Sequence, residues 1–396
     1  MKEFKNSILI NSIKLKKILK KFNIPIYLYN YKKIIYNIYI IKKLNFYCFY
    51  SVKSNDNLYI LKIVNLIIKK FDIVSIGELK KIILINKKKP YIIFSGSGKN
   101  ITELLISIKL NIFCINIESI QEYFKIYFLI KNYKKIINIM IRINPNIDAK
   151  THEKISTGKY NNKFGISILN LKNIFLIFKI TKFCFFGIDF HIGSQITKIS
   201  PIKKLIYLIN ILLKLFNFNY IDIGGGIGVN YYDKKNIINL SNYYNNIFFL
   251  LKKKKIKFFL EIGRFFFANT CIIFSKVNYL KFNILNNLSI INIGINDIIR
   301  PALYSAFHKI ESLNKGKNFK NIFGVTCESS DKFINYNKIK LKSNSIIVIY
   351  SCGSYCKVLS NNYNSKNKSF EIIIYKNKLK LIFKNETIKN LINNYD

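Results

Sequence analysis

The feature that most constrains the fold of this chain is an alternation of short β-rich runs with longer segments of helical spacing. In the longer segments leucine, isoleucine and lysine recur with the period of a helix. We predict strands at residues 46–52, 71–75, 91–95, 111–117, 136–143, 185–192, 220–223 and 257–261. Eight β/α units over roughly 220 residues match a closed (β/α)8 (TIM) barrel, an α/β fold, and leave an open doubly wound sheet as the competing architecture.

The texture of the sequence changes after about residue 270. The later segments CIIFSKVNYLKF (271–282), SIIVIYSCG (345–353) and FEIIIYKNKLKLIF (370–383) read as strands with turns. The first 30 residues end in another strand-like run, IPIYLYN. We therefore predict a barrel domain over residues 31–268. Residues 1–30 and 269–396 are predicted to form a β domain, of β-sandwich or β-barrel-like type, that contributes substrate and dimer-interface residues.

The net charge of +45, taken alone, favours a nucleic-acid or anionic-membrane partner. However, of the 65 basic residues only Arg142, Arg264 and Arg300 are arginine. The lysines are scattered through a chain that is equally rich in Ile, Asn, Phe and Tyr, which is the mixture that A+T-rich codons produce. We attribute the charge to coding bias and expect only weak, sequence-blind binding to nucleic acid.

The cysteine pattern and the apolar runs indicate the compartment. Seven cysteines form no CxxC pair, which fits a reducing compartment and predicts neither a disulfide framework nor a metal site. The stretch MKEFKNSILINSIKLKKILKK has no signal-peptide core, and no apolar run reaches the length of a membrane span. We expect a cytoplasmic protein with no membrane partner.

Unusual residues follow the predicted strands, where barrel enzymes carry their chemistry. They are Lys53 after the first strand, Arg142 at the end of the fifth, His191 at the end of the sixth with Ser194 just beyond it, Gly224–Gly226 after the seventh, and Glu261 at the end of the eighth with Arg264 just beyond it. Consecutive glycines let backbone N–H groups approach an anion, so we predict a phosphorylated ligand. The three arginines favour function because only arginine binds carboxylate or phosphate through two parallel bonds.

Eleven short motifs, read in order, resemble those of the diaminopimelate decarboxylases. They are YSVKSN (50–55), DIVSIGEL (72–79), FSGSGK (94–99), RINPNIDAKTHEKISTG (142–158), KFGI (163–166), GIDFHIGSQI (187–196), DIGGGIG (222–228), EIGR (261–264), INDIIRPALYSAFH (295–308), CESSD (327–331) and SNNYNS (360–365). The likeness runs from about residue 22 to residue 375. It implies a pyridoxal-phosphate enzyme built on a barrel and a β domain.

The resemblance implies roles for the cofactor-site residues. Lys53 would be the catalytic lysine that binds the cofactor covalently, His191 would stack on its ring, and Glu261 would pair with the ring nitrogen. A protonated ring nitrogen makes the cofactor an electron sink. The phosphate would be held by Ser194, Gly224, Gly225, Gly226, Gly263 and Arg264, and Tyr355 would contact both cofactor and substrate.

The resemblance also implies a substrate site shared between two chains. Arg264, Arg300 and Tyr304 would grip the far amino-acid end of the substrate. Cys327 would be the catalytic proton donor and Glu328 a substrate contact, both inserted by the partner subunit of a homodimer. A pair of arginines suits a dicarboxylate substrate.

The motifs depart from the family pattern at several places. EIGR replaces EPGR, INIGIND replaces DAGMND, Ser330 replaces a glycine, and Lys366–Ser369 replace RPRP. None of these changes removes a residue with an assigned role, so we predict an active enzyme with a less rigid scaffold.

The leading hypothesis is a carboxy-lyase that converts meso-2,6-diaminopimelate to L-lysine and carbon dioxide, the last step of lysine biosynthesis. A sibling ornithine or arginine decarboxylase is the nearest alternative. An alanine-racemase-like activity would want a basic residue opposite the ring nitrogen, where this chain has Glu261. A nucleic-acid-binding protein is the alternative from another class, and its binding would weaken steeply with salt.

Overall fold

The computed structural model describes residues 9–10, 13–14, 18–19, 21–44, 46–86, 90–181, 185–231, 240–251, 256–282, 287–314, 316–333, 338–393 and 395. The chain divides into two compact units. The first, here called the barrel unit, comprises Ile38–Val229 and Lys235–Phe265. The second, here called the β unit, comprises Met1–Asn37, Asn230–Lys234 and Phe266–Asp396. Each unit is described by itself.

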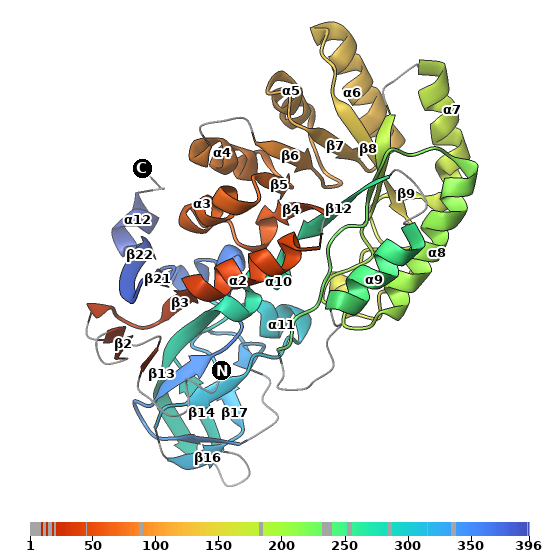
Figure 1. The fold of residues 1–396 in the computed structure, drawn as a ribbon. Coiled ribbons are helices and arrows are strands. Elements are labelled where there is room, and N and C mark those ends of the chain that lie inside the picture. The colour runs from red at the N-terminus through yellow and green to blue at the C-terminus, as the bar shows by residue number, and fades with distance from the viewer. Residues whose placement is uncertain are drawn as a thin grey trace. The chain divides into compact units, whose positions relative to one another are not determined.

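The barrel unit contains a closed ring of parallel strands (Figure 1). In ring order they are β4 (Tyr47–Ser51), β5 (Lys70–Ile73), β6 (Tyr91–Phe94), β7 (Cys114–Ile117), β8 (Asn138–Asn144), β10 (Phe185–Phe190), β11 (Tyr220–Asp222) and β12 (Lys257–Ile262). Pairing of β12 with β4 and of β10 with β8 closes the ring, and a short strand, β9 (Ile166–Ser167), adds to β8. The predicted TIM barrel is confirmed, and the open doubly wound sheet was the wrong alternative.

Helices connect the barrel strands, and α3 to α6 lie outside β4 to β8 in Figure 1. The helices are α3 (Leu58–Ile67), α4 (Ile76–Ile85), α5 (Ile101–Lys109), α6 (Ile120–Tyr133), α7 (Leu171–Thr181), α8 (Ser200–Leu215) and α9 (Leu240–Leu251). The side chains of Asn57, Ser75, Asn100 and Ser119 cap the first four of these helices. Such caps satisfy backbone N–H groups that a helix leaves unpaired, so each strand-to-helix turn has a defined end.

The barrel interior changes from apolar to charged along the strands. An apolar cluster is formed by Phe49, Ile93, Cys114, Met140 and Phe259. Residues two apart on a strand point to the same side. All five members of the cluster are therefore followed, toward the carboxyl ends, by a buried polar residue on the same side: Ser51, Ser95, Asn116, Arg142 and Glu261. This order places the charged groups where barrel enzymes carry their sites.

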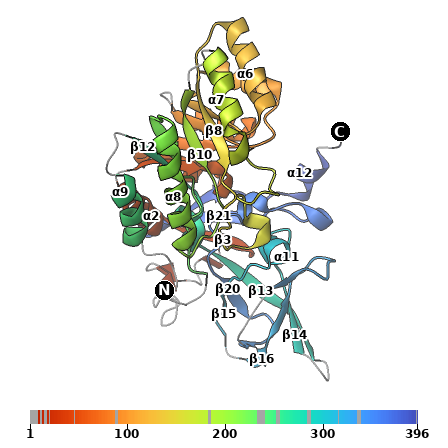
Figure 2. The ribbon, with the colours of Figure 1, turned by 90° about the vertical axis from the view of Figure 1, so that its right-hand side faces the viewer.

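The β unit is built around a mixed sheet, whose strands β13 and β14 run together in Figure 2. Its order is β18 (Lys332–Phe333), β17 (Asn321–Phe323), β14 (Asn287–Ile291), β13 (Cys271–Phe282), β3 (Ile26–Asn30), β21 (Phe370–Tyr375) and β22 (Lys378–Phe383). Strand β20 (Ile346–Ile349) pairs with β13 and with β15 (Ile310–Ser312). The strand-like run near the N-terminus is β3, and it lies between β13 and β21, strands far along the chain.

Smaller elements complete the described residues. Strands β16 (Lys317–Phe319) and β19 (Ile339–Leu341) form a separate pair, as do β1 (Leu9–Ile10) and β2 (Ile13–Lys14). The remaining helices are α2 (Tyr31–Lys42), α10 (Arg264–Phe267), α11 (Arg300–Tyr304) and α12 (Ile388–Ile392). Among the described residues no helix is long and apolar enough to cross a membrane. Six cysteines have free thiols, and Cys184 lies outside the described residues.

Candidate active site

Lys53 lies just beyond the end of β4 and faces a buried acid. It sits in a short 3-10 helix, Val52–Ser54, and its Nζ is 3.2 Å from Oδ2 of Asp72 on β5. The side chain of Lys53 is 37% exposed, whereas that of Asp72 is fully buried. Burial, and then the Glu261 carboxylate, raise the pKa of Asp72 to about 6 against the lowering effects of Lys53 and His191. The amine is therefore accessible and is paired with a carboxylate from the neighbouring strand.

His191 lies between two buried carboxylates. Its Nδ1 is 2.8 Å from Oδ1 of Asp189, and its Nε2 is 2.8 Å from Oε2 of Glu261. Burial by itself lowers the pKa of His191, but Asp189 and Glu261 outweigh burial and raise it to about 10. Burial likewise would raise the pKa of Glu261, and His191 reverses the sign so that it is lowered. The ring is therefore an imidazolium, and Glu261 is ionised.

The three glycines after β11 each have a steric reason to lack a side chain. Gly224 has a φ of +69°, and an added Cβ there would lie 2.9 Å from Cδ2 of His191. A Cβ on Gly225 would lie 2.0 Å from the carbonyl oxygen of Glu261, and one on Gly226, with a φ of +86°, would lie 2.4 Å from a backbone oxygen. The turn therefore brings backbone close to His191 and Glu261 at positions where a side chain would not fit.

Ser194 and Arg264 meet in the same unit. The guanidinium of Arg264 donates to Oγ of Ser194 from Nη2 at 2.9 Å and from Nε at 3.2 Å. Gly263 precedes Arg264, and a Cβ there would lie 3.0 Å from Cβ of Ser54, in the segment that carries Lys53. The structure thus brings the barrel residues of the predicted cofactor site together.

Several polar residues at this end of the barrel were not singled out from the sequence. Asp72, Asp189, Asp222 and Glu261 are all buried, and only Glu261 was predicted as a site residue. Asp222 accepts the backbone N–H of Gly224 at 2.7 Å and so fixes the start of the glycine turn. The available signal was position: each unpredicted acid stands in or at the end of a predicted strand, where a buried carboxylate needs a reason.

Arg142 is held in a buried ion pair. Its Nη1 is 2.8 Å from Oε1 of Glu118, and both side chains are nearly fully buried. Glu118 also accepts the backbone N–H groups of Gly96 and Gly165, each at 3.0 Å. This pair ties three loops at the strand ends together, so the structure supports a structural function for Arg142 in place of the ligand-binding one expected from the rarity of arginine.

The remaining predicted residues lie in the β unit. Arg300 begins α11, is buried, and stacks on the ring of Tyr231 with 4.6 Å between the guanidinium carbon and the ring centroid. Tyr304 ends the same helix, and Tyr355 has a φ of +56°, a strained conformation that clusters at functional sites. Cys327 and Glu328 are exposed, and Glu328 accepts a short hydrogen bond from the hydroxyl of Tyr363.

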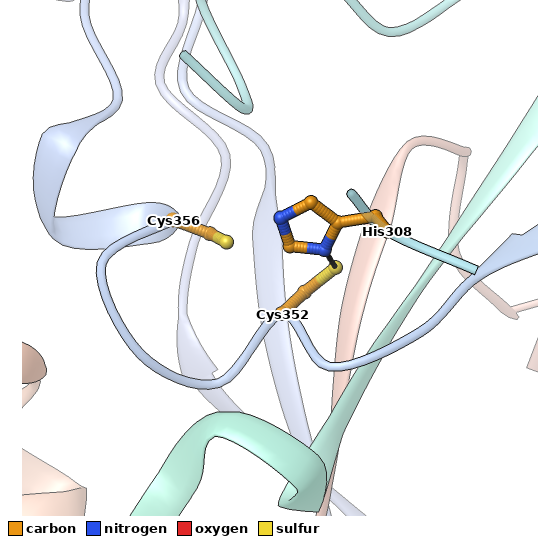
Figure 3. Close-up of side chains that lie close together, drawn as sticks. All are labelled: His308, Cys352 and Cys356. Carbon is orange, nitrogen blue, oxygen red and sulfur yellow. Dashed lines mark hydrogen bonds between the residues drawn. The ribbon is translucent and has the colours of Figure 1, made fainter. Parts of the chain in front are cut away.

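His308, Cys352 and Cys356 come together in the β unit with three potential metal-binding atoms within 4.8 Å of one another (Figure 3). Nε2 of His308 is 2.8 Å from Nη1 of Arg300, and a guanidinium can only donate. The ring proton is therefore on Nδ1, which donates to the carbonyl of Tyr350 at 2.9 Å. Nδ1 is also the atom 3.7 Å from Sγ of Cys352, so an N–H, and no lone pair, faces the sulfurs. This hydrogen bonding disfavours a metal ion and holds Arg300 in place.

The fold and the barrel site together define a (β/α)8-barrel enzyme with an accessible lysine facing buried carboxylates. Residues 38–268 match the family described as pyridoxal-dependent decarboxylase, pyridoxal binding domain. Diaminopimelate decarboxylase from Neisseria meningitidis serogroup B is 33% identical to this chain, over 87% of this chain and 85% of its own length. The enzyme of the same name from Campylobacter jejuni is 34% identical over 95% of this chain and 97% of its length.

A crystal structure of diaminopimelate decarboxylase from Helicobacter pylori, complexed with L-lysine, has a TM-score of 0.88 to this chain. It is 32% identical and covers 96% of this chain and 99% of its own. The chain therefore belongs to the pyridoxal-dependent decarboxylases and, within them, to the diaminopimelate decarboxylases.

Proposed function

We propose that this chain is a carboxy-lyase that converts meso-2,6-diaminopimelate to L-lysine and carbon dioxide, the last step of lysine biosynthesis. The observation that carries the proposal is the placement of Lys53 and Glu261 at the carboxyl ends of β4 and β12, two strands that pair directly. Both groups lie among the charged side chains at the carboxyl ends of the barrel strands, and the chain belongs to the family that carries out this reaction.

The residues present fit pyridoxal phosphate. Oε1 of Glu261 is buried and has no hydrogen-bond partner among the described residues, so it can accept a proton donor such as a ring N–H. When bound, the cofactor supplies an electron sink for the electrons that departing carbon dioxide leaves behind. Lys53 would hold it covalently through its amine, and Glu261 would keep the ring nitrogen protonated. His191 would lie against the ring, and Ser194, Gly224, Gly225, Gly226, Gly263 and Arg264 would hold the phosphate.

For the substrate we propose that Arg264, Arg300 and Tyr304 bind the far carboxylate, together with Glu328 and Tyr355. The guanidinium of Arg300 is fixed by His308 and Tyr231 while its Nε is buried without a hydrogen-bond partner in the described part of the chain. A fixed donor with an unused N–H suits a carboxylate ligand because little side-chain freedom is lost on binding.

We further propose a homodimer with shared active sites, in which Cys327 donates the proton and Glu328 contacts substrate across the subunit interface. Their exposure in the single chain supports this, since residues with these roles need surroundings that exclude water. The free thiols of the six described cysteines support a reducing, cytoplasmic location.

The test of the function is release of carbon dioxide from meso-diaminopimelate with and without added pyridoxal phosphate. Release is expected to need the cofactor and to be matched by L-lysine. Lys53→Ala should lose both the release and the visible absorbance of bound cofactor, whereas Lys62→Ala, at an exposed position of α3, should keep both. A loaded protein that releases nothing, or release that survives in Lys53→Ala, would contradict the proposal. Ornithine and arginine in the same assay decide the sibling-decarboxylase alternative.

Shared sites are tested by mixing subunits. Lys53→Ala and Cys327→Ala chains, each inactive alone, should regain part of the activity when refolded together, because one site of the mixed dimer keeps both native residues. Persistent inactivity of the mixture, with dimers present by light scattering, counts against sharing.

A further inference from the structure

We infer that Asp189 is a positioning residue that orients the His191 ring and keeps it doubly protonated. The inference concerns the charge of the ring and holds for any substrate; its consequence for cofactor binding rests on the proposed function.

The carboxylate of Asp189 is itself fixed. Asp189 lies on β10 and is fully buried. Its Oδ2 accepts a hydrogen bond from Nδ2 of Asn116 on β7 at 3.2 Å, and the same Nδ2 donates to Oγ of Ser95 at 3.2 Å. Its Oδ1 is the atom 2.8 Å from Nδ1 of His191. Since each oxygen has a partner on a different element, the carboxylate cannot rotate without losing one of them.

The ring is confined on its other sides as well. Gly224 leaves no room for a Cβ beside Cδ2 of His191, and Oε2 of Glu261 faces Nε2. The carbonyl oxygen of His191 accepts a hydrogen bond from Thr157 at 2.8 Å, which fixes the backbone that carries the ring. These contacts leave the imidazole one orientation, with each nitrogen toward a carboxylate.

This geometry determines the protonation state. A neutral imidazole carries one N–H, so one of its nitrogens would present a lone pair to a carboxylate at 2.8 Å. The charged and titratable groups that face the ring are Asp189, Glu261, Asp72, Asp222 and Lys53. Burial and the neighbouring carboxylates hold the pKa of Asp222 well above its usual range, so the carboxylates that favour the imidazolium are those of Asp189, Glu261 and Asp72.

Asp189 and Glu261 divide the task. Both oxygens of Asp189 accept from groups within the barrel, whereas Oε1 of Glu261 accepts from no N–H group of the described residues and the Glu261 carboxyl has that of Asp72 beside it. Asp189 therefore maintains the proton on His191 whatever Glu261 binds. The consequence is a ring held as an imidazolium in one orientation beside the glycine turn, with its charge balanced by the two carboxylates.

The experiment follows the ring nitrogens of His191 by 15N NMR in the full-length chain, with and without pyridoxal phosphate. The chain has three histidines, so the signals can be assigned by single substitutions at His152 and His308. In the native chain we expect His191 to stay protonated up to at least pH 8. In Asp189→Asn, which keeps the shape and removes the charge, the titration midpoint should fall by about 2 pH units. A midpoint that moves by less than about 0.5 unit would overturn the inference, since a purely space-filling Asp189 predicts that result.

Two further variants and a control make the test specific. Asn116→Ala keeps the Asp189 carboxylate but frees it, so a smaller fall of about 1 unit is expected; it also provides the measurement if Asp189→Asn does not fold. Asp189→Glu restores the charge and should recover part of the native midpoint. Asp148→Asn removes an acid from an exposed position of the same unit and should leave the midpoint unchanged.

Cofactor affinity measured against pH separates this inference from the proposed function. Asp189→Asn should lose affinity for pyridoxal phosphate at a lower pH than the native chain does. If the native chain binds the cofactor but releases no carbon dioxide, while the His191 midpoint falls as expected, the proposed function fails and the role of Asp189 stands. Decarboxylation with an unmoved midpoint overturns the role of Asp189 alone.

Discussion

Replacing Gly225 by alanine should disturb the barrel site through one steric contact. The added Cβ would lie 2.0 Å from the carbonyl oxygen of Glu261, and real Cβ atoms essentially never come within 3.0 Å of such an atom, so the two must separate by about 1 Å. Glu261 cannot move freely, because its strand is paired with β11 on one side and β4 on the other. Overpacking of this kind costs about 1–3 kcal/mol.

The same shift strains the hydrogen bond from the Glu261 N–H to the Gly224 carbonyl, which is 3.0 Å long. Losing it adds about 1 kcal/mol, so Gly225→Ala should lower the free energy of unfolding by about 2–4 kcal/mol. Because Glu261 itself is displaced, the turnover number should fall by about 100-fold.

Urea unfolding followed by circular dichroism, together with steady-state kinetics, measures both effects. Gly98→Ala is the matched control, because its Cβ would meet no atom within 4 Å. If Gly225→Ala unfolds within about 0.5 kcal/mol of the native chain and turns over normally, the packing of the turn against Glu261 has been misjudged.

Three other perturbations test separate parts of the structure. Because burial and Glu261 raise the pKa of Asp72 from 3.8 to about 6, its contribution to stability is present below about pH 4 and is lost as the pH rises to about 6. In urea unfolding at pH 4 and pH 7 the native chain should lose at most about 3 kcal/mol of stability between the two pH values through this group, and Asp72→Asn should not show that loss. A native chain that is equally stable at both pH values would contradict this prediction. Arg142→Met should destabilise the chain by about 3–5 kcal/mol in the same assay, because it leaves Glu118 buried and unpaired. Lys159→Met, which breaks an exposed ion pair, should leave the urea midpoint unchanged. Equal effects of the two substitutions would argue against a structural role for Arg142. After dialysis against zinc the protein should hold well below one ion per chain by elemental analysis, and a chelator should not move its melting temperature; stoichiometric zinc would show that the proton of His308 is on the other nitrogen.

The barrel strands could be predicted because each is a short β-rich run between amphipathic segments. The predicted strand 111–117 begins instead at Cys114, because Asn111 has a φ of +49° and belongs to the turn after α5. Strand 185–192 ends at Phe190, which leaves His191 in the following loop. Boundaries of this kind depend on single backbone conformations, which hydrophobic periodicity does not report.

Some of the charged residues at the carboxyl ends of the barrel strands could be predicted from the sequence, and others could not. Lys53, His191 and Glu261 stand in motifs with glycine or serine neighbours, which marked them as unusual. Asp72 and Asp189 also stand in quoted motifs, but no role was assigned to them, because their partners Lys53 and His191 are identified only by the side-chain geometry at the strand ends. The rarity of arginine misled at Arg142, because a buried structural pair with Glu118 also requires the planar guanidinium.

Closure of the barrel by β12 and β4 has a consequence for the chain during its synthesis. Lys53 is made early, but its barrel neighbour Glu261 follows only after about 10–40 s at a typical bacterial or eukaryotic rate of 5–20 residues per second. Until then β4 has an unpaired edge and the amine lacks its distant carboxylate. Asp72 is only 19 residues further along, so this carboxylate can pair with the Lys53 amine while the chain is still being synthesised. A nascent chain stalled before residue 257 should therefore expose an unpaired sheet edge that is prone to aggregation until the last strand pairs with it.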